Sequence, residues 1–580
     1  MNKGIFRLLT AYRDGCLLLG LMLLLLLPTF GQAQRFGNEW INRNQTYFKI
    51  PVGEDGIYRI SYDDLQTAGF PVDNVDPRRM QLFFRGQEQA ILIEGQQDAS
   101  FDPADFLLFY GQRNDGTLDR ELYVAPEAQG NPYYNLYSDT TAYFLTWSLA
   151  AVNGKRMGFF QENNITNIPA EPFHWKEALL QLTNQFSLGR QYPLGSAANF
   201  SVHLSNFDYG EGWTGPRLRQ GQSATYSLEA PAQYTTGPLP QLEVMLTGRN
   251  NRPHDVTIEV GSSTGALREL STVNFDYYEN QLLSEALQWS DLSGGNLNVR
   301  VTVNGVDGGA DFVSIAYIRL RYPQQLTAQG AIPAIFDLQE NPLGKSYLEV
   351  AAPPTAPYLL DISDENNVSR IGFNLVNGDL TTIVPNTQTG RKLMLGSTKN
   401  IPGIRRVQFQ NISAAANYLI VSNERLHAPA GNYSDPVRAY YDYRASAAGG
   451  SFTPILFDID QLFDQFSYGE PTPLAIRRFA DYMLSVGAPR YLLLIGKGLT
   501  VNFNYYRQDP DAATLHDLVP TGGIPGSDVV LTSGLGDSDG YGAAIPTGRI
   551  NARSAAEVAA YLDKVKETEA RSLADDYQEG

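Results

Sequence analysis

The sequence predicts a multidomain protein in which β-sandwich-like domains precede a C-terminal α/β domain with a parallel sheet. At 580 residues the chain is too long for one hydrophobic core, so three or four domains are expected. Residues 46–415 consist largely of short apolar runs separated by Gly, Pro and polar turns, a pattern typical of sandwiches and barrels. From Tyr418 onward, short apolar strands alternate with amphipathic helical segments, which indicates a parallel sheet.

The first 33 residues read as a secretory signal peptide. Three basic residues precede an apolar run from Cys16 to Leu27, and small residues surround a candidate cleavage point after Ala33. An uncleaved anchor is the alternative, although the run is shorter than the ~20 residues of a spanning helix. Cys16 is the only cysteine. The processed chain would therefore contain no thiol nucleophile and no thiolate metal site.

Residues 34–195 are predicted to form an N-terminal β-rich domain. The segments Thr46–Val52 and Ile57–Tyr62 flank the turn Gly53–Gly56, which predicts a β-hairpin. Asp63–Leu65 is expected to open a short helix. A tyrosine cluster follows, and although it could bind sugar, packing within the core is the favoured interpretation. Its members are Tyr133, Tyr134, Tyr137 and Tyr143.

Two further β-rich units are predicted, a β-sandwich over residues 196–323 and a bridging module over residues 324–415. His203–Trp213 is either a ligand loop or, preferably, a structural loop. Gly261–Gly265 matches the G-x-S-x-G pattern of hydrolase nucleophiles, but that motif requires a strand-to-helix turn. It lies between β-like segments here, so a hairpin loop is favoured.

Residues 416–580 are predicted to form the α/β domain. Ser434 or Asp435 should cap a helix that has Pro436 in its first turn. A second helix is expected over Pro473–Val486, where apolar residues recur with helical spacing. Strands are expected at YLIVS, TPILFDI and RYLLLIG. A final helix should begin at a capping box, in which Ser554 pairs with Glu557.

The candidate site lies where these strands end, because open α/β sheets carry their working loops at the carboxyl edge. The predicted edge residues are Gly496, Lys497, Ser527 and Asp528. Gly496-Lys497-Gly498 lacks the spacing of a nucleotide-binding loop, so a tight turn is favoured. His516, followed by Asp517, is a candidate general base, with a surface or packed histidine as the favoured alternative.

No cofactor is required by these patterns, and a structural calcium ion is the open alternative. Asp537 and Asp539 precede Gly540 in a turn of the kind found in calcium loops, although ordinary Asp-Gly turn chemistry is the favoured interpretation. The net charge of −18 and the lack of a basic cluster argue against a nucleic-acid partner.

Four collinear C-terminal segments resemble the gingipain-type cysteine peptidases, most closely the sortase-like (PorU-type) members of the type IX secretion system of Bacteroidota. The segments are ILFDIDQLFDQFSYGEPTPLAIRRFADYM, RYLLLIGKG, LVPTGGIPGSDVVLT and AIPTGRINARSAAEVAAYLDKVKETE. The resemblance implies a caspase-like α/β fold and peptide cleavage by a Cys–His dyad. It also implies removal of C-terminal sorting signals from secreted cargo, other secretion components as partners, and a place at the outer membrane or cell surface.

The chain departs from this family in two respects. An aspartate is usual where this chain has Lys497. The dyad follows a segment resembling LADDYQEG, at which this chain ends, so we expect the peptidase domain to be truncated and assign no catalytic residue. We expect the chain as given to be inactive. The alternative is a non-catalytic surface scaffold of β-sandwich modules with a degenerate peptidase-like domain.

Overall fold

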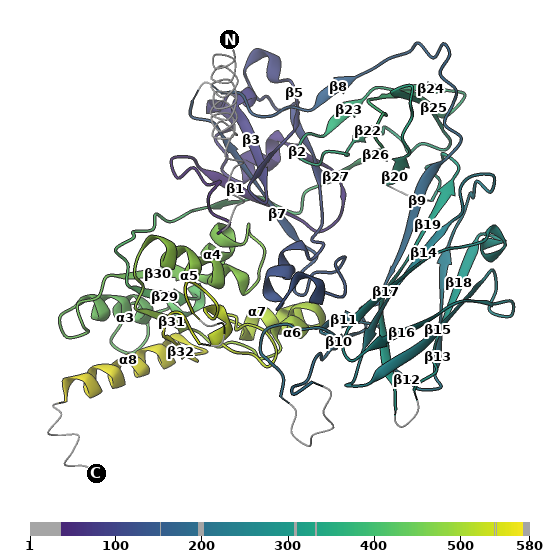
Figure 1. Ribbon diagram of the computed structural model, residues 1–580. Coiled ribbons are helices and arrows are strands. Elements are labelled where there is room, and N and C mark those ends of the chain that lie inside the picture. The colour runs from purple at the N-terminus through teal and green to yellow at the C-terminus, as the bar shows by residue number, and fades with distance from the viewer. Residues whose placement is uncertain are drawn as a thin grey trace, which may run out of the picture.

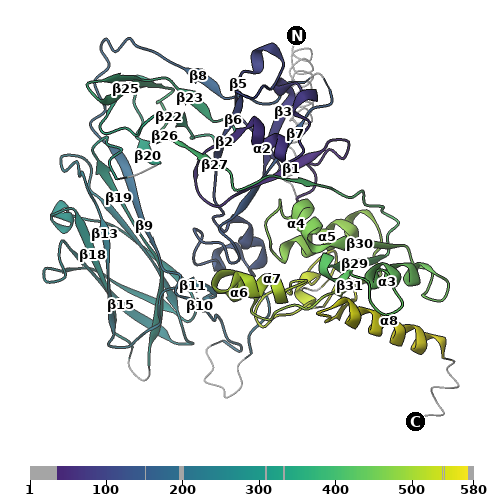
Figure 2. The same ribbon diagram turned by 180° about the vertical axis from the view of Figure 1, so that it is seen from behind.

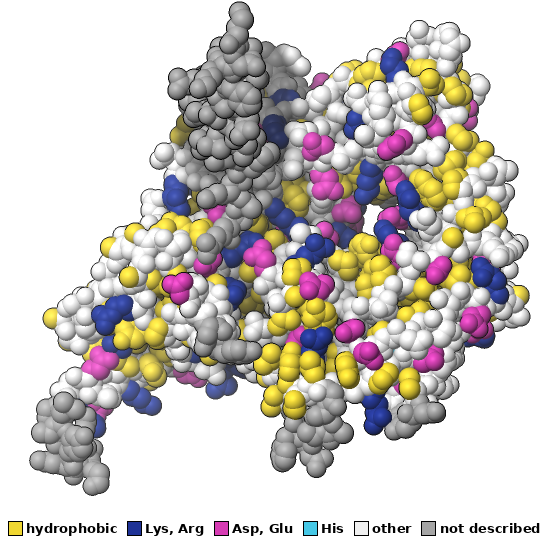
Figure 3. Space-filling model, viewed as in Figure 1, with side chains coloured by type: hydrophobic (Ala, Val, Ile, Leu, Met, Phe, Trp, Pro, Cys, Tyr) yellow, Lys and Arg dark blue, Asp and Glu magenta, His cyan; other side chains and the backbone are white. Residues whose placement is uncertain are grey.

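The computed structural model describes residues 36–150, 152–194, 202–306, 310–330, 333–538, 540 and 542–571. The β-rich part of the chain forms several packed sheets, and the α/β domain lies beside the N-terminal strands (Figures 1 and 2). The predicted signal peptide lies outside the described residues. Within them, no helix combines the length and apolar character needed to cross a membrane. Acidic and basic side chains are interspersed over the face shown in Figure 3.

An N-terminal sandwich is built from two sheets around an apolar core that includes Phe48, Ile60 and Phe109. The first sheet has the order β28-β1-β7-β3-β4 and the second β27-β2-β6-β5. Their bounds are β1 Tyr47–Val52, β2 Gly56–Ser61, β3 Met80–Phe84, β4 Gln87–Gln89, β5 Leu92–Glu94, β6 Phe106–Gly111, β7 Thr141–Trp147, β27 Thr398–Asn400 and β28 Arg405–Val407.

The predicted hairpin of residues 46–62 is wrong, although both of its strands are present. β1 pairs with β7 and β28, whereas β2 pairs with β6 and β27 in the opposite sheet. Both strands bury alternate residues in the same core. The turn at Gly53–Gly56 therefore carries the chain across the sandwich. The expected short helix is α2, Tyr62–Thr67, capped by Ser61.

The second sandwich packs one end of a large mixed sheet against a four-stranded antiparallel sheet of order β13-β18-β15-β16. Gly261–Gly265 connects β15 to β16, which confirms a hairpin loop. The bounds are β9 His174–Gln181, β12 Leu218–Arg219, β13 Ser223–Glu229, β14 Gln241–Gly248, β15 Pro253–Gly261, β16 Arg268–Asp276, β17 Asn280–Ala286, β18 Asn296–Val303 and β19 Phe312–Gln324. A two-stranded ladder, β10 Gln185–Ser187 with β11 Gly212–Thr214, lies beside it.

The large sheet crosses the predicted domain boundaries at residues 195 and 323, because β9 pairs with both β19 and β20. Its far end packs over a three-stranded sheet of order β21-β25-β24. The bounds of these strands are β8 Gly158–Phe160, β20 Ala334–Leu338, β21 Lys345–Val350, β22 Tyr358–Asp361, β23 Ser369–Ile371, β24 Asn374–Val376, β25 Asp379–Pro385 and β26 Arg391–Gly396.

The α/β domain contains a fully parallel sheet of order β30-β29-β31-β32, as the sequence predicted. Alternate residues of each strand face opposite layers: Leu492 and Leu494 contact the α4–α5 side, and Leu493 and Ile495 the α3–α8 side. The bounds are β29 Tyr418–Ser422, β30 Pro454–Asp458, β31 Tyr491–Ile495, β32 Thr547–Ile550, α3 Pro436–Ala445, α4 Ile459–Phe466, α5 Leu474–Val486, α6 Asn502–Gln508, α7 Pro510–His516 and α8 Ala555–Ala570.

The helix starts match the sequence signals closely. Asp435 caps α3, with Pro436 at the first helical position. Only half of the predicted capping box of α8 forms: the Ser554 hydroxyl accepts from the Glu557 N–H, but the Glu557 carboxylate accepts from the Arg553 N–H. The glutamate thus satisfies the donor one residue before the cap.

Candidate active-site edge

The carboxyl ends of the parallel strands form one edge, and the strand order reverses there between β29 and β31. Open α/β sheets place their ligand crevices at this reversal. The loop after β31 starts at Gly496, and the loop after β29 starts at Asn423. The Asn423 Nδ2 donates to the Leu518 carbonyl at 3.0 Å. This hydrogen bond joins the loop after β29 to the connection after β31 at the predicted crevice.

Arg549 of β32 connects two of the predicted edge residues. Its guanidinium forms a bidentate pair with the Asp528 carboxylate, at 2.8 Å from Nε and 2.7 Å from Nη2. Its Nη1 donates to the carbonyls of Gly496 at 2.8 Å and Val519 at 2.7 Å. Because such forked pairs fix both distance and orientation, Arg549 holds the loop after β31 against the loop that carries Asp528. The sequence signal for this role was an arginine inside a short strand.

The backbone conformation and the close packing at position 496 require a glycine. Its φ is +148°, and a Cβ at this position would lie 2.8 Å from the Val519 Cγ2. Its N–H donates to the Ile550 carbonyl at 2.9 Å. The adjacent Lys497 is fixed by main-chain bonds, since its carbonyl accepts from the Leu518 and Val519 N–H groups. Lys497 is half-buried.

Ser527 lies in the neighbouring turn rather than in the Arg549 network. It exchanges two main-chain hydrogen bonds with Gly522, at 2.9 and 3.3 Å. Its Oγ accepts from the Val529 N–H at 3.2 Å, next to the start of the short helix η8, Val529–Leu531. The structure therefore brings Gly496 and Asp528 together through Arg549, and places Ser527 in the adjoining turn.

The His516-Asp517 pair divides into an exposed and a buried residue. His516 ends α7 and is exposed, in line with the favoured surface interpretation. Asp517 is only 5% exposed, and its Oδ1 accepts from the Leu499 N–H at 2.7 Å. Burial raises the pKa of Asp517 to about 6. The carboxylate, not the histidine, is thus the group that organises the loop after β31.

A second polar cluster at the same edge was missed by sequence reasoning. His427 lies between two aspartates that precede helices: its Nδ1 is 2.8 Å from an Asp435 oxygen and its Nε2 is 3.1 Å from an Asp458 oxygen. The nearby carboxylates, first that of Asp458 and then that of Asp435, raise the pKa of His427 to about 9 against the opposing effect of burial. The helix caps at 435 and 458 were the available signal.

The proposed calcium pair is described only in part, since Asp539 lies outside the described residues. Asp537 is exposed in the loop before β32. Within the described residues, no group of three or more His, Cys, Asp or Glu side chains is placed to hold a metal. Calcium binding stays a prediction.

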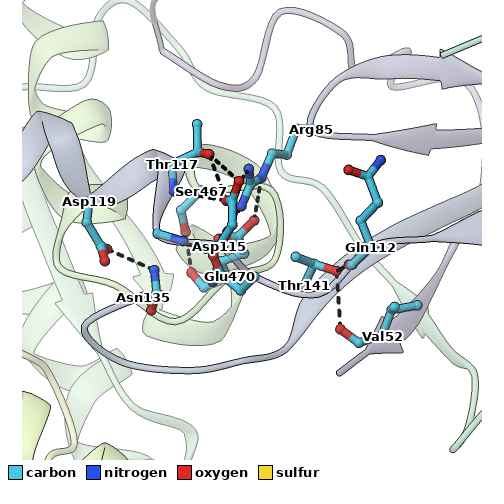
Figure 4. Close-up of polar contacts among 12 residues, drawn as sticks. Val52, Arg85, Gln112, Asp115, Thr117, Asp119, Asn135, Thr141, Ser467 and Glu470 are labelled. Atoms are coloured by element: carbon cyan, nitrogen blue, oxygen red, sulfur yellow. Dashed lines mark hydrogen bonds and ion pairs between the residues drawn. The ribbon is translucent and has the colours of Figure 1, made fainter. Parts of the chain in front are cut away.

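Buried ion pairs attach the N-terminal sandwich to the α/β domain. Arg85, in the turn between β3 and β4, donates from Nε to the Glu470 carboxylate at 2.8 Å (Figure 4). The other Glu470 oxygen accepts from the Asn114 Nδ2 at 2.8 Å, and Asp115 adds a second acid beside the guanidinium at 3.3 Å. The Glu470 side chain is only 2% exposed. The contact is therefore a desolvated, hydrogen-bonded charge network between domains.

Aromatic packing continues this interface. Phe503 of α6 packs against Phe186 and Phe207 of the β-rich region, with ring centroids 3.9 and 5.8 Å apart. Tyr137 is buried against Tyr506 of the same helix, and Tyr143 is buried in the N-terminal core. The tyrosine cluster thus serves packing, the interpretation favoured from the sequence. The loop His203–Trp213 likewise supplies buried aromatic residues to this interface.

A cleft of about 590 Å³ opens beside the edge, between the β-rich region and the α/β domain. One wall comes from Glu121–Val124 and Leu204–Phe207. The opposite wall comes from Arg477 of α5 and from the segment that contains Gly522, Ser527 and Val529–Leu531. The walls are joined by the Ser205 carbonyl, which accepts from the Ile524 N–H at 2.9 Å. The predicted residue Ser527 thus lines a cleft that both regions build.

Comparison with known proteins identifies the C-terminal region. Residues 411–579 match the model of peptidase family C25. The chain is similar in structure to dimeric latent PorU from Porphyromonas gingivalis, with a TM-score of 0.58 and 16% identity over 92% of this chain and 50% of that chain. Comparison with curated proteins gives no match.

Two carbohydrate-binding modules also match, each over about a quarter of the chain. A CBM36-1 domain of a xylanase from the hindgut metagenome of Trinervitermes trinervoides covers 25% of this chain and 96% of its own, at 14% identity and a TM-score of 0.15. A CBM36 module in complex with calcium and xylotriose covers 24% and 98%, at 15% identity and a TM-score of 0.15. At these scores neither supports an argument.

The chain spans half the length of the PorU chain, and at 16% identity that match speaks for the fold alone. The β-rich multidomain architecture with a C-terminal parallel sheet is confirmed. The resemblance found in the sequence is confirmed as well: residues 411–579 carry the pattern of peptidase family C25, the gingipain family, within a PorU-like fold.

Proposed function

We propose that this protein is an exported, gingipain-like cysteine peptidase of the type IX secretion system that removes C-terminal sorting signals from secreted cargo. The observation that carries the proposal is the edge built by Arg549, Gly496 and Asp528 within the segment that matches the peptidase family. Peptidases of this kind need a rigid sheet edge on which a thiolate, a histidine and oxyanion donors are aligned. The chain supplies that edge.

In this proposal, the described residues position the edge and do not perform the bond-breaking step. Cys16 is the only cysteine and belongs to the proposed signal peptide. We expect residues 34–580 to show no peptidase activity and no labelling by iodoacetamide, because the thiolate is the reacting group in both cases. The peptide-cleaving dyad would belong to a longer form of the protein.

The proposed location is the outer membrane or cell surface, with secreted proteins and other type IX secretion components as partners. The basic and apolar N-terminal segment supports export. The family match to a peptidase supports protein substrates. Structural calcium at Asp537 and Asp539 stays part of the proposal.

The test begins with the coding sequence beyond codon 580. We expect it to encode a Cys and a His, and the longer product to cleave a cargo protein that carries a C-terminal sorting signal. Substituting that cysteine with alanine should abolish cleavage without lowering the melting temperature. A longer product that has no such pair, or that leaves the cargo intact, would refute the peptidase proposal.

The second candidate is a non-catalytic surface scaffold. It is favoured by the Arg85–Glu470 network, which joins the N-terminal sandwich to the α/β domain through buried charges. A scaffold would bind cargo with the same affinity whether or not the cysteine of the longer product is present. Cleavage that depends on the cysteine would decide against it.

A further inference from the structure

One charged group lines the cleft without an acidic partner. Of the described residues that form its walls, only Glu121 and Arg477 carry a formal charge. Glu121 is already neutralised, because both of its oxygens accept from the guanidinium of Arg478, at 2.5 and 3.2 Å. Within the described part of the chain, no carboxylate forms an ion pair with Arg477. The cleft therefore presents an arginine that makes no direct ion pair among the described residues and feels the negative charges of Asp481 and Glu121 only through longer-range attraction.

Arg477 is held in place by its backbone contacts. Its Nη1 donates to the carbonyls of Val530 and Ser533, each at 2.8 Å. These bonds anchor α5 to η8 and to the residues just after it, and they set the direction of the guanidinium. Hydrogen bonds to neutral carbonyls offset only part of the free energy that a guanidinium loses when it leaves water. Burial accordingly lowers the pKa of Arg477. A planar guanidinium in this state is suited to a forked contact with a carboxylate.

Apolar side chains flank the charge. Val124 on one wall is 45% exposed and Val529 on the other is 42% exposed, although both line the same cleft. The volume of about 590 Å³ lies in the range of ligand clefts, roughly 300 to 1,000 Å³. A ligand that filled it would place a carboxylate at Arg477 and apolar groups against the two valines.

We propose that this cleft binds an extended peptide segment through a carboxylate group that pairs with Arg477. The peptide class rests on the proposed function, whereas the carboxylate is assigned from the cleft itself. The carboxylate can come from an Asp or Glu side chain or from a peptide C-terminus, since both offer the same two oxygens. Arg477 would then determine which peptides bind, in a cleft whose walls come from both the β-rich region and the α/β domain.

The experiment uses residues 34–580 and four pools of fluorescent hexapeptides. Two pools have amidated ends and contain either one Glu or one Gln at random positions. The other two contain no acidic side chain and end in either a free carboxylate or an amide. We expect the Glu pool, the free-carboxylate pool or both to bind at least about tenfold more tightly than the matched neutral pool, as a charge-assisted fork requires. Which pool responds identifies the source of the carboxylate.

Arg477→Gln should remove this preference, and Arg219→Gln on the exposed strand β12 should keep it. Because Arg477→Gln also weakens two backbone contacts, a second variant acts only on the cleft. Val124→Trp fills it from an exposed position and should abolish binding of every pool while the melting temperature stays unchanged. Equal binding of all pools, no binding at about 1 mM, or a preference that survives Arg477→Gln would overturn the inference.

Failure of the two proposals can be told apart. Binding by residues 34–580 needs neither a cysteine nor a catalytic histidine. Carboxylate-dependent binding together with a longer product that cleaves nothing would leave this inference standing and remove the peptidase proposal. Cleavage of cargo that is insensitive to Arg477→Gln would support the peptidase proposal and remove this inference.

Discussion

Replacing Arg85 with Asn should uncouple the N-terminal sandwich from the α/β domain. Arg85 has φ +42° in the β3–β4 turn, a left-handed conformation that Asn tolerates well. The substitution thus preserves the turn while it removes the guanidinium from Glu470. Any loss of stability can then be attributed to the charge network and not to the backbone.

The size of the effect follows from burial. Arg85 and Glu470 have side-chain exposures of 17% and 2%, so the substitution leaves a nearly dehydrated carboxylate. Removing one member of a buried pair costs about 3 to 5 kcal/mol. Asn114 still donates to Glu470, and the strain at residue 85 is relieved, so we expect about 2 to 4 kcal/mol. The double variant Arg85→Asn/Glu470→Gln should recover most of this loss, since no buried charge is left.

The pH dependence supplies a second check. Burial raises the pKa of Glu470 above its ordinary value. Without Arg85 the carboxyl group takes up a proton more readily, and a neutral carboxyl group is easier to bury. A raised carboxyl pKa contributes stability below the unfolded-state pKa that is lost as pH rises through the folded-state pKa. The destabilisation by Arg85→Asn should therefore be smaller at about pH 5 than at about pH 8.

Hydrogen exchange measured by mass spectrometry suits this multidomain chain, because a single unfolding free energy is not defined for it. Peptides covering residues 459–472 should exchange faster in the variant, and peptides of the second sandwich should not change. Unchanged exchange at residues 459–472 at pH 8, or a double variant no more protected than the single one, would refute the reasoning.

Four further predictions follow from the edge. The raised pKa of His427, about 9, contributes stability that is complete below its unfolded value near 6.5 and is lost as pH rises through about 9. The excess stability of wild type over His427→Asn, about 1 to 2 kcal/mol after screening, should therefore disappear over this range, and a melting-temperature difference that does not change with pH would refute it. Arg549→Lys should speed exchange of residues 518–528 while leaving α8 protected, because an ammonium cannot replace the fork. Gly496→Ala should cost about 1 to 3 kcal/mol in unfolding experiments through its contact with a valine methyl group, and an unchanged midpoint would contradict this. Calcium should raise the melting temperature through Asp537 and Asp539, and chelation without effect would exclude the site.

The α/β domain was predictable because its signals are local. The buried runs at β29, β30 and β31 and the helical spacing of Ile476, Phe479 and Met483 depend on neighbouring residues only. Parallel pairing follows, since each strand is separated from the next by a helix. The prediction of a candidate site at the carboxyl edge needed no more than this order.

The contacts that join distant segments were not predictable. Arg85 and Glu470 are separated by 385 positions, and no sequence pattern relates one to the other. The hairpin at Gly53–Gly56 failed for a related reason: alternation predicts a strand but does not say which sheet it joins. Asp517 attracted attention only through the histidine beside it, because burial cannot be read from one residue in a loop.

Residues 398–407 return to the N-terminal sandwich, and this has a consequence for folding. β27 pairs with β2 and β28 pairs with β1, each as an outer strand of its sheet. Until these residues are available, β1 and β2 present open edges, which attract other strands and promote aggregation. During synthesis from the N-terminus, the first sandwich therefore lacks two of its strands until about four hundred residues have been made. The segment that leads into the α/β domain is also the one that closes the first sandwich, so assembly of the two is ordered in time.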